Sequence, residues 1–107
     1  MELHQYQIVI VNLDPTIGSE IRKTRPCVIV SPDEMNRHLQ TITVCPITTT
    51  SKKYPTRIAI NVLRKASWIA VDQIRTLDRN RIVKTLGHLN QNKIIEIKAV
   101  IKETFVD

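Results

Sequence analysis

The sequence predicts a small, mainly β domain that ends in one amphipathic helix. Isoleucine and valine together supply 26 of the 107 residues, and only four side chains are aromatic. Such β-branched side chains pack well on pleated sheets. Short apolar runs between polar turns recur up to about residue 86, and a helical spacing of apolar residues begins only near residue 90. We therefore expect a strongly bent antiparallel sheet of five to seven short strands with a helix packed on it.

The first two strands are expected at residues 8–13 and 27–30, because both are continuous apolar runs bounded by turn residues. Residues 14–25, which include a proline and a glycine, form the connecting loop in this prediction. Pro26 opens the second strand, since proline cannot donate a hydrogen bond within a sheet. Arg25 would thus lie at the mouth of a rigid strand, where its guanidinium loses little further rotamer freedom when it binds a planar anion.

A single helical turn is expected over residues 31–36, with Ser31 as its N-cap and Pro32 at the first helical position. The third strand is expected at residues 41–46. The polar and basic segment 48–55 lacks periodicity and predicts a loop.

Three more strands are predicted in the second half of the chain, at residues 57–61, 67–71 and 81–86, with the polar block 72–80 joining the last two. No long linker or repeat interrupts the pattern. The length also suits one core, so residues 1–107 are expected to form a single domain.

The closing helix is predicted by a change of period. Asn90 or Asn92 can cap its start. Its apolar positions recur every three or four residues, at Ile94, Ile97, Ile101 and Phe105.

The net charge of +6 and a pI near 9.7 favour a polyanionic partner such as nucleic acid, although basic residues can equally serve only solubility. The first seven residues contain no apolar leader segment, and no run is long enough to span a membrane, so we expect a cytoplasmic protein with no membrane association. Cys27 and Cys45 lie in apolar runs without metal-ligand spacing, which predicts buried, reduced thiols.

Three short blocks carry the functional signal. Residues 13–20 read LDPTIGSE and residues 24–26 read TRP; residues 46–48 read PIT after the third strand; and residues 72–78 read DQIRTLD. In order and spacing, these blocks resemble the conserved blocks of the MazF/PemK (Kid-type) toxins, small endoribonucleases of bacterial toxin–antitoxin pairs. The resemblance covers nearly the whole chain.

The resemblance implies an SH3-like antiparallel β-barrel with a C-terminal α-helix, of the CcdB/PemK type, that forms a homodimer. It implies a toxin of a type II system: a sequence-selective endoribonuclease that cleaves single-stranded mRNA without a metal or other cofactor and leaves 2′,3′-cyclic phosphate and 5′-hydroxyl ends. The implied protein partner is a cognate antitoxin of the MazE/PemI type, and DNA would be bound only through the antitoxin complex.

The resemblance assigns catalysis to Arg25 and Thr48. An arginine fork donates two parallel hydrogen bonds to a phosphate and keeps its charge at any working pH. Arginine is a poor general base, so Glu20 is the candidate for that role. Taken alone, each residue also has a structural interpretation: a solvated arginine, a strand-end threonine, and a carboxylate paired with Arg22 or Lys23.

The predicted RNA-binding residues surround this pair. Amide and carboxylate groups can read exposed base edges, and a basic loop with one aromatic side chain can grip phosphates and stack a base. The alternatives are a solvated loop and, for Asp72, a bond to Arg75 or a turn amide. Trp68 is expected in the core. The predicted RNA-binding residues are Ser19, Thr49, Lys52, Lys53, Tyr54, Arg57, Asp72 and Gln73.

The chain departs from the family pattern at three places. The family opens its first strand with a basic residue, glycine and an acidic residue, where this chain has Tyr6 and Gln7. Some relatives have an arginine where this chain has Ala70, and the usual glycine near Lys23 is absent. Arg25 and Thr48 are retained, so the departures bear on sequence preference.

Two other functions are compatible with the same barrel. A gyrase poison of the CcdB type relies on a Trp-Gly-Ile tail, whereas this chain ends in Thr-Phe-Val-Asp. A noncatalytic RNA-binding barrel is the second alternative. The histidines His4, His38 and His88 lie outside the matched blocks and do not suggest a paired-histidine mechanism.

Overall fold

The computed structural model describes residues 2–13, 23–50 and 54–106. Seven strands are present in these residues: β1 (Gln7–Asn12), β2 (Thr24–Ile29), β3 (Thr41–Thr48), β4 (Arg57–Val62), β5 (Lys65–Ala70), β6 (Arg75–Asp78) and β7 (Ile82–His88). The helices are α1 (Asp33–His38) and α2 (Gln91–Ile101), with 3₁₀ turns η1 (Val71–Gln73) and η2 (Arg79–Arg81) and a π-helical end, η3 (Lys102–Val106).

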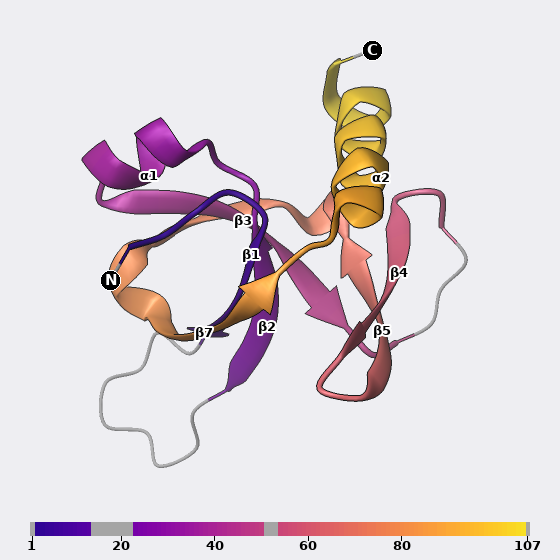
Figure 1. Cartoon of the computed structure of the whole chain (residues 1–107), viewed down its shortest axis with the longest axis horizontal. Helices are drawn as coiled ribbons and strands as arrows, with labels where there is room; N and C mark the ends of the chain where they lie inside the picture. The colour runs from indigo at the N-terminus through magenta and orange to yellow at the C-terminus, as the bar shows by residue number, and fades with distance from the viewer. Residues whose placement is uncertain (1, 14–22, 51–53, 107) are drawn as a thin grey trace.

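All strands belong to one curled antiparallel sheet with the order β4-β5-β3-β2-β1-β7, and β6 pairs with β3 off this path. In Figure 1 the sheet curls around one side of the molecule, the β4–β5 hairpin lies on the other, and α2 stands beside their junction. Two register shifts between β1 and β7 accompany the bend. The expectation of a mainly β fold with a C-terminal helix is confirmed, and the sheet forms a half-barrel.

Strand β3 connects the two parts of the sheet. Its first half pairs with β6, from Thr41 to Val44, and its last two residues, Ile47 and Thr48, pair with β5. Pro46 lies at the change of partner, where its missing N–H is not required. Because β3 also pairs with β2, it lies between β2 and the β4–β5 hairpin.

The sheet has a core on each face. The first core lies inside the curl and comprises Leu3, Val9, Val11, Cys27, Ile29, Ile42, Val44, Leu77 and Ile82. The second lies toward α2 and comprises Val28, Cys45, Ile47, Ile58, Val62, Ile69, Val71, Leu89 and Ile97. Adjacent residues of β2 and β3 enter opposite cores, as strand alternation requires. Cys27 and Cys45 are buried free thiols, as predicted.

Several predicted strand boundaries need correction: the strand predicted at 67–71 spans 65–70, the one predicted at 81–86 spans 82–88, and two more lie near the predicted site. The first loop was expected to extend to Arg25, but β2 begins at Thr24, and Arg25 pairs with Val11 of β1. The third strand was expected to end at Pro46, but it continues to Thr48. β2 is extended by its pairing with β1, and β3 by its pairing with β5. The hydrogen bonds between strands join backbone groups and do not require apolar side chains.

The helical turn before β3 is also shifted. α1 begins at Asp33, Pro32 is the N-cap residue, and no side chain caps the helix. Ser31 was expected to be the cap; instead its hydroxyl donates to Asn36 Oδ1 at 2.5 Å and accepts from the backbone N–H of Thr43 at 3.1 Å. The competing tertiary bond therefore takes the serine away from the helix end.

The last third of the chain holds two further corrections. The polar block at 72–80, expected to be a connection, contains β6, in which Leu77 is buried and the other three residues are exposed. The helix begins as predicted, with the Asn90 side chain accepting from the N–H of Lys93. Phe105, however, lies in η3 and is 52 % exposed, because the change to π-helical geometry breaks the period that placed it on the apolar face. None of the helices described is long and apolar enough to cross a membrane.

Candidate active site

Arg25 and Thr48 lie at facing ends of two neighbouring strands. The pairing of β2 with β3 sets Cys27 opposite Pro46. Arg25 and Thr48 each lie two residues beyond this pair, near the start of β2 and at the end of β3. Opposed residues of an antiparallel pair project from the same face of the sheet. Since alternate residues of a strand share a face, Arg25 and Thr48 lie on the face of Cys27 and Pro46, at the ends of neighbouring strands.

The inner core lies directly behind this pair. Cys27 is fully buried, and its Sγ lies 3.8 Å from the carbonyl oxygen of Arg25. Burial raises the pKa of the Cys27 thiol to about 12, against the smaller opposing effects of Arg25 and Arg75. Both guanidinium groups are therefore close enough to act on this thiol, while both residues are exposed.

Arg75 is a cation that the sequence analysis did not assign to the site. It lies opposite Val44 of β3 and two residues from buried Leu77, so its side chain belongs to the same face as Arg25. A usable signal was present in the third block, where Arg75 and Leu77 occupy alternate positions. Recognising it requires knowing that the block contains a strand.

Thr48 is half-buried, and its Oγ1 accepts a hydrogen bond from the backbone N–H of Thr50 at 3.1 Å. This bond uses an acceptor position and leaves the hydroxyl proton for donation, since a threonine hydroxyl has one donor and two acceptor positions. Thr49, the neighbouring residue in the predicted RNA-binding set, is exposed. On the neighbouring strand β5, Trp68 lies directly opposite Thr48. Trp68 is half-buried and belongs to neither core, which corrects the prediction that placed it in the core.

Asp72 and Arg57 form an ion pair beside the start of β4. Arg57 Nε lies 3.2 Å from Asp72 Oδ1, and its NH2 group donates to Oδ2 at 3.3 Å. Thr56 donates its hydroxyl to the same carboxylate at 2.9 Å, and the Arg57 guanidinium lies 5.6 Å from the centroid of the Tyr54 ring. The partner of Asp72 is therefore Arg57, where the sequence analysis had considered Arg75.

This pairing changes what Arg57 has available for a ligand. Its side chain is 7 % exposed, whereas the Asp72 side chain is 34 % exposed and Tyr54 is 50 % exposed. Gln73 ends η1 and is exposed. Tyr54, Asp72 and Gln73 thus face outward, with Arg57 supporting two of them from behind. Four predicted site residues, Ser19, Glu20, Lys52 and Lys53, lie outside the described residues.

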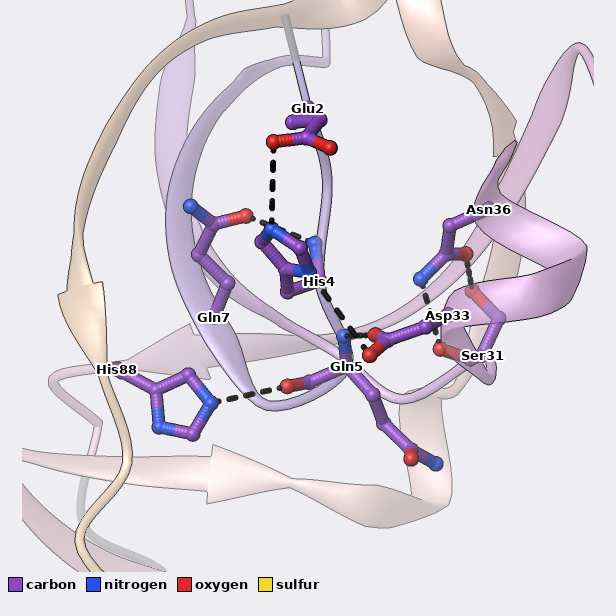
Figure 2. Close-up of polar contacts among 8 residues, drawn as sticks. All are labelled: Glu2, His4, Gln5, Gln7, Ser31, Asp33, Asn36 and His88. Carbon is purple, nitrogen blue, oxygen red and sulfur yellow. Dashed lines mark hydrogen bonds and ion pairs between the residues drawn. The ribbon is translucent and has the colours of Figure 1, made fainter.

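A hollow of 590 Å³ lies elsewhere, at the N-terminal segment. Figure 2 shows His4 between two carboxylates, with ring nitrogens 3.9 Å from Glu2 and 3.8 Å from Asp33. His88 Nε2 lies 3.1 Å from the carbonyl oxygen of Gln5, and its Nδ1 lies 2.8 Å from that of Leu89. These contacts tie the N-terminal segment to the end of β7, so we attribute a structural role to this cluster.

In the part of the chain that the structure describes, no group of three or more His, Cys, Asp or Glu side chains is arranged to hold a metal ion. The arrangement at the strand ends offers a different chemistry: two guanidinium groups, a hydroxyl and an indole on one exposed face, with amide and carboxylate groups nearby. Cations and hydroxyl donors of this kind bind phosphate, and aromatic rings stack on bases.

Comparison with known proteins agrees with this chemistry. The chain matches, over residues 4–105, the model of a family described as PemK-like, MazF-like toxin of type II toxin–antitoxin system. It is 36% identical over 100 residues to Endoribonuclease MazF of Staphylococcus saprophyticus, a match that covers 88% of this chain and 83% of that protein.

Solved structures of MazF proteins have the same fold. The structure is similar to Mycobacterium tuberculosis toxin MazF-mt6, with a TM-score of 0.79 and 26% identity over 92% of this chain and 95% of that one. It is also similar to a chain in a MazE–MazF crystal structure from Deinococcus radiodurans, with a TM-score of 0.81 and 24% identity over 96% of this chain and 95% of that one. Because the family model spans nearly the whole sequence, this chain is a member of the PemK-like, MazF-like toxins of type II toxin–antitoxin systems.

Proposed function

We propose that this protein is an endoribonuclease that cleaves single-stranded mRNA, and that Arg25 and Thr48 act together on the scissile phosphate. The observation that supports this most is the pairing of β2 with β3, because Arg25 and Thr48 each lie two residues beyond the Cys27–Pro46 pair, on the face of that pair. The name of the 36% identical staphylococcal relative supports the same activity.

The reaction requires the 2′-oxygen of one nucleotide to attack the adjacent phosphorus while the bond from phosphorus to the 5′-oxygen breaks. Negative charge develops on the nonbridging oxygens in the transition state. The Arg25 guanidinium can donate two hydrogen bonds to these oxygens, and the Thr48 hydroxyl can donate a third. A cation and a hydroxyl held on adjacent strands are already oriented, so little reorganisation accompanies the step.

Two proton transfers complete the balance. The 2′-hydroxyl loses its proton to a base, and the departing 5′-oxygen gains one, which leaves a 2′,3′-cyclic phosphate and a 5′-hydroxyl. Arginine remains protonated in proteins and does not serve as the base. Glu20 is the carboxylate that we assign to this role.

The neighbouring residues would bind the rest of the strand. Tyr54, Thr49 and Gln73 are exposed on the loops that border the strand ends. Asp72 keeps part of its carboxylate accessible while Arg57 holds it in place. Unstacked bases of single-stranded RNA present edges that such amide, hydroxyl and carboxylate groups can read. Ser19, Lys52 and Lys53 complete the proposed RNA-binding set and supply positive charge for the backbone.

A cognate antitoxin is the proposed protein partner. The Deinococcus radiodurans structures contain MazF with MazE. An acidic, partly apolar antitoxin segment would be attracted to a chain of net charge +6 and would compete with RNA for the same face. We further propose that the toxin acts in the cytoplasm as a homodimer and contacts DNA only through the antitoxin complex.

The decisive test is cleavage of a long single-stranded RNA by the purified protein in excess chelator. We expect discrete fragments with 2′,3′-cyclic phosphate ends, and no cleavage of a copy that carries 2′-deoxy substitutions at the mapped cut sites. Loss of cleavage in chelator with recovery on adding a divalent ion would contradict the metal-independent reaction. Binding of RNA without cleavage in either buffer would favour the noncatalytic barrel.

A further inference from the structure

Trp68 lies on the strand next to Thr48 and shares its face of the sheet. β5 pairs with β3 so that Trp68 is the direct partner of Thr48, and with β4 so that it is also the direct partner of Ala59. Directly opposed residues share a face, and neighbouring strands lie about 4.8 Å apart. The indole is therefore rooted one strand away from the Thr48 hydroxyl.

The surroundings of Trp68 leave part of its ring accessible. Its buried strand neighbour Ile69 points into the core beneath α2, so Trp68 points away from that core. On its own face it is flanked by small side chains: Ala66 lies two residues before it and Ala59 lies opposite, and both are exposed. Trp68 also lines a surface hollow of 230 Å³ with Ala59, Ala66 and Lys93.

A half-buried tryptophan among alanines is an unusual choice for packing alone. A large ring contributes most to stability when larger apolar side chains enclose it, and here its neighbours on this face include two alanines and the polar Thr48. The same arrangement gives a flat apolar surface beside the proposed phosphate site, and a stacking surface next to phosphate-binding groups is typical of single-strand binding proteins.

We propose that Trp68 is a stacking platform for the base of a nucleotide that adjoins the scissile phosphate. This inference rests on the proposed endoribonuclease function. With the phosphate held between Arg25 and Thr48, the base attached to the neighbouring sugar reaches the adjacent strand, where the indole lies. Stacking accepts any base because every base has a π face, so Trp68 supplies affinity and fixes the position of the scissile bond. Selectivity among bases is left to polar groups such as Gln73.

The test uses the fact that Trp68 is the only tryptophan in the chain. A short RNA with a single 2′-deoxy substitution at the cut site is titrated into the full-length protein, and Trp68 fluorescence is followed with anisotropy of a labelled copy of the RNA. We expect saturable quenching of the fluorescence with the same midpoint as the anisotropy. Trp68→Leu should weaken binding roughly 5- to 150-fold, whereas Trp68→Phe, which keeps an aromatic face, should lose much less.

The matched controls address folding and position. Circular dichroism and thermal melting check that Trp68→Leu remains folded. Replacing the base next to the cut site with an abasic residue should weaken wild-type binding about as much as Trp68→Leu does, and should weaken binding by Trp68→Leu little further. This non-additivity is expected if ring and base touch.

The outcomes separate this inference from the proposed function. Saturable binding without quenching, or a folded Trp68→Leu variant with wild-type affinity, overturns the stacking platform even if the protein cleaves RNA. Quenching and weakened Trp68→Leu binding, in a protein that does not cleave unmodified RNA, support the platform and overturn the endoribonuclease. Equal losses from Trp68→Leu and Trp68→Phe would also overturn stacking, since an aromatic face would then carry no advantage.

Discussion

Two polar regions of the molecule differ in whether their side chains have hydrogen-bond or ion-pair partners. In the N-terminal cluster, which also includes Ser31 and Asn36, the side chains of these two residues bond to each other in the interior. Both ring nitrogens of His88 lie within hydrogen-bond distance of carbonyl oxygens. At the strand ends, no hydrogen bond or ion pair joins the side chain of Arg25 or Arg75 to another described residue. Polar groups that already have partners stabilise the fold, whereas an exposed cation without one can bind a substrate at no cost in broken bonds.

The largest expected effect comes from the strand ends. Arg25→Ala should lower kcat/KM for RNA cleavage by about 10²- to 10³-fold or more, because it removes the charge that stabilises the transition state. Thermal stability should change little, since Arg25 is exposed. Cleavage rates on a mapped RNA, together with melting curves, measure both quantities.

Arg37→Ala is the matched control, because Arg37 is an exposed arginine in the last turn of α1 and lies outside the proposed site. It should keep cleavage within about twofold of wild type. Arg25→Lys keeps the charge and loses the fork, so intermediate activity is expected. Wild-type cleavage by a folded Arg25→Ala protein would remove the catalytic role that we assign to the strand ends.

The N-terminal cluster should respond in the opposite way. Asn36→Ala leaves the buried Ser31 hydroxyl and carbonyl without their partner, and should lower the free energy of unfolding by about 1 to 3 kcal/mol. The folded variant should retain its kcat for RNA cleavage. Urea unfolding and cleavage assays at a temperature well below the melting point separate the two effects.

Asn80→Ala provides the comparison, because Asn80 is exposed and should change stability by no more than about 0.5 kcal/mol. A folded Asn36→Ala protein of normal stability that has lost cleavage would reverse the roles that we give the two regions.

The two buried cysteines give a prediction about how stability depends on pH. Burial raises the pKa of both Cys27 and Cys45 to about 12, from an unfolded value of about 8.5. Between these values the folded chain holds more protons than the unfolded chain, so stability is complete below about pH 8 and falls as the pH rises, by about 1.4 kcal/mol per pH unit for each thiol.

Urea unfolding at pH 7, 8, 9 and 10 measures this slope. A Cys27→Ala, Cys45→Ala variant, although less stable overall, should show a flatter dependence on pH above pH 8.5. An unchanged slope in that variant would assign the alkaline loss to other groups.

The sequence predicted most of the β fold because each strand's apolar run is continuous or alternates with polar residues. The register of β2 against β3 was not predictable, because the 11-residue connection between them does not fix strand pairing. β6 was missed since its exposed residues resemble a loop. Trp68 and Arg75 were missed as site residues for the same reason: their importance comes from the strands beside them and not from their own neighbours in sequence.

The turn of the β4–β5 hairpin has a strained backbone, and relieving that strain tests whether it serves the function of the strand ends. Leu63 and Arg64 form its turn with φ values of 51° and 64°, a conformation that favours asparagine and glycine. Leu63→Asn combined with Arg64→Gly should therefore raise the free energy of unfolding by about 1 to 2 kcal/mol. Urea unfolding measures this gain. Cleavage should stay within about twofold of wild type, because the turn lies at the far end of β5 from the Thr48–Trp68 pair.

Leu39→Asn is the control for removing an exposed leucine, since Leu39 is 43 % exposed and has a negative φ of −101°. It should give no comparable gain. A variant that is more stable but cleaves RNA more slowly would show that the strained turn helps to position the strand ends. Strained conformations are retained in proteins where they position a functional surface. The exposed strand ends would then depend on the hairpin as well as on the pairing of β2 with β3.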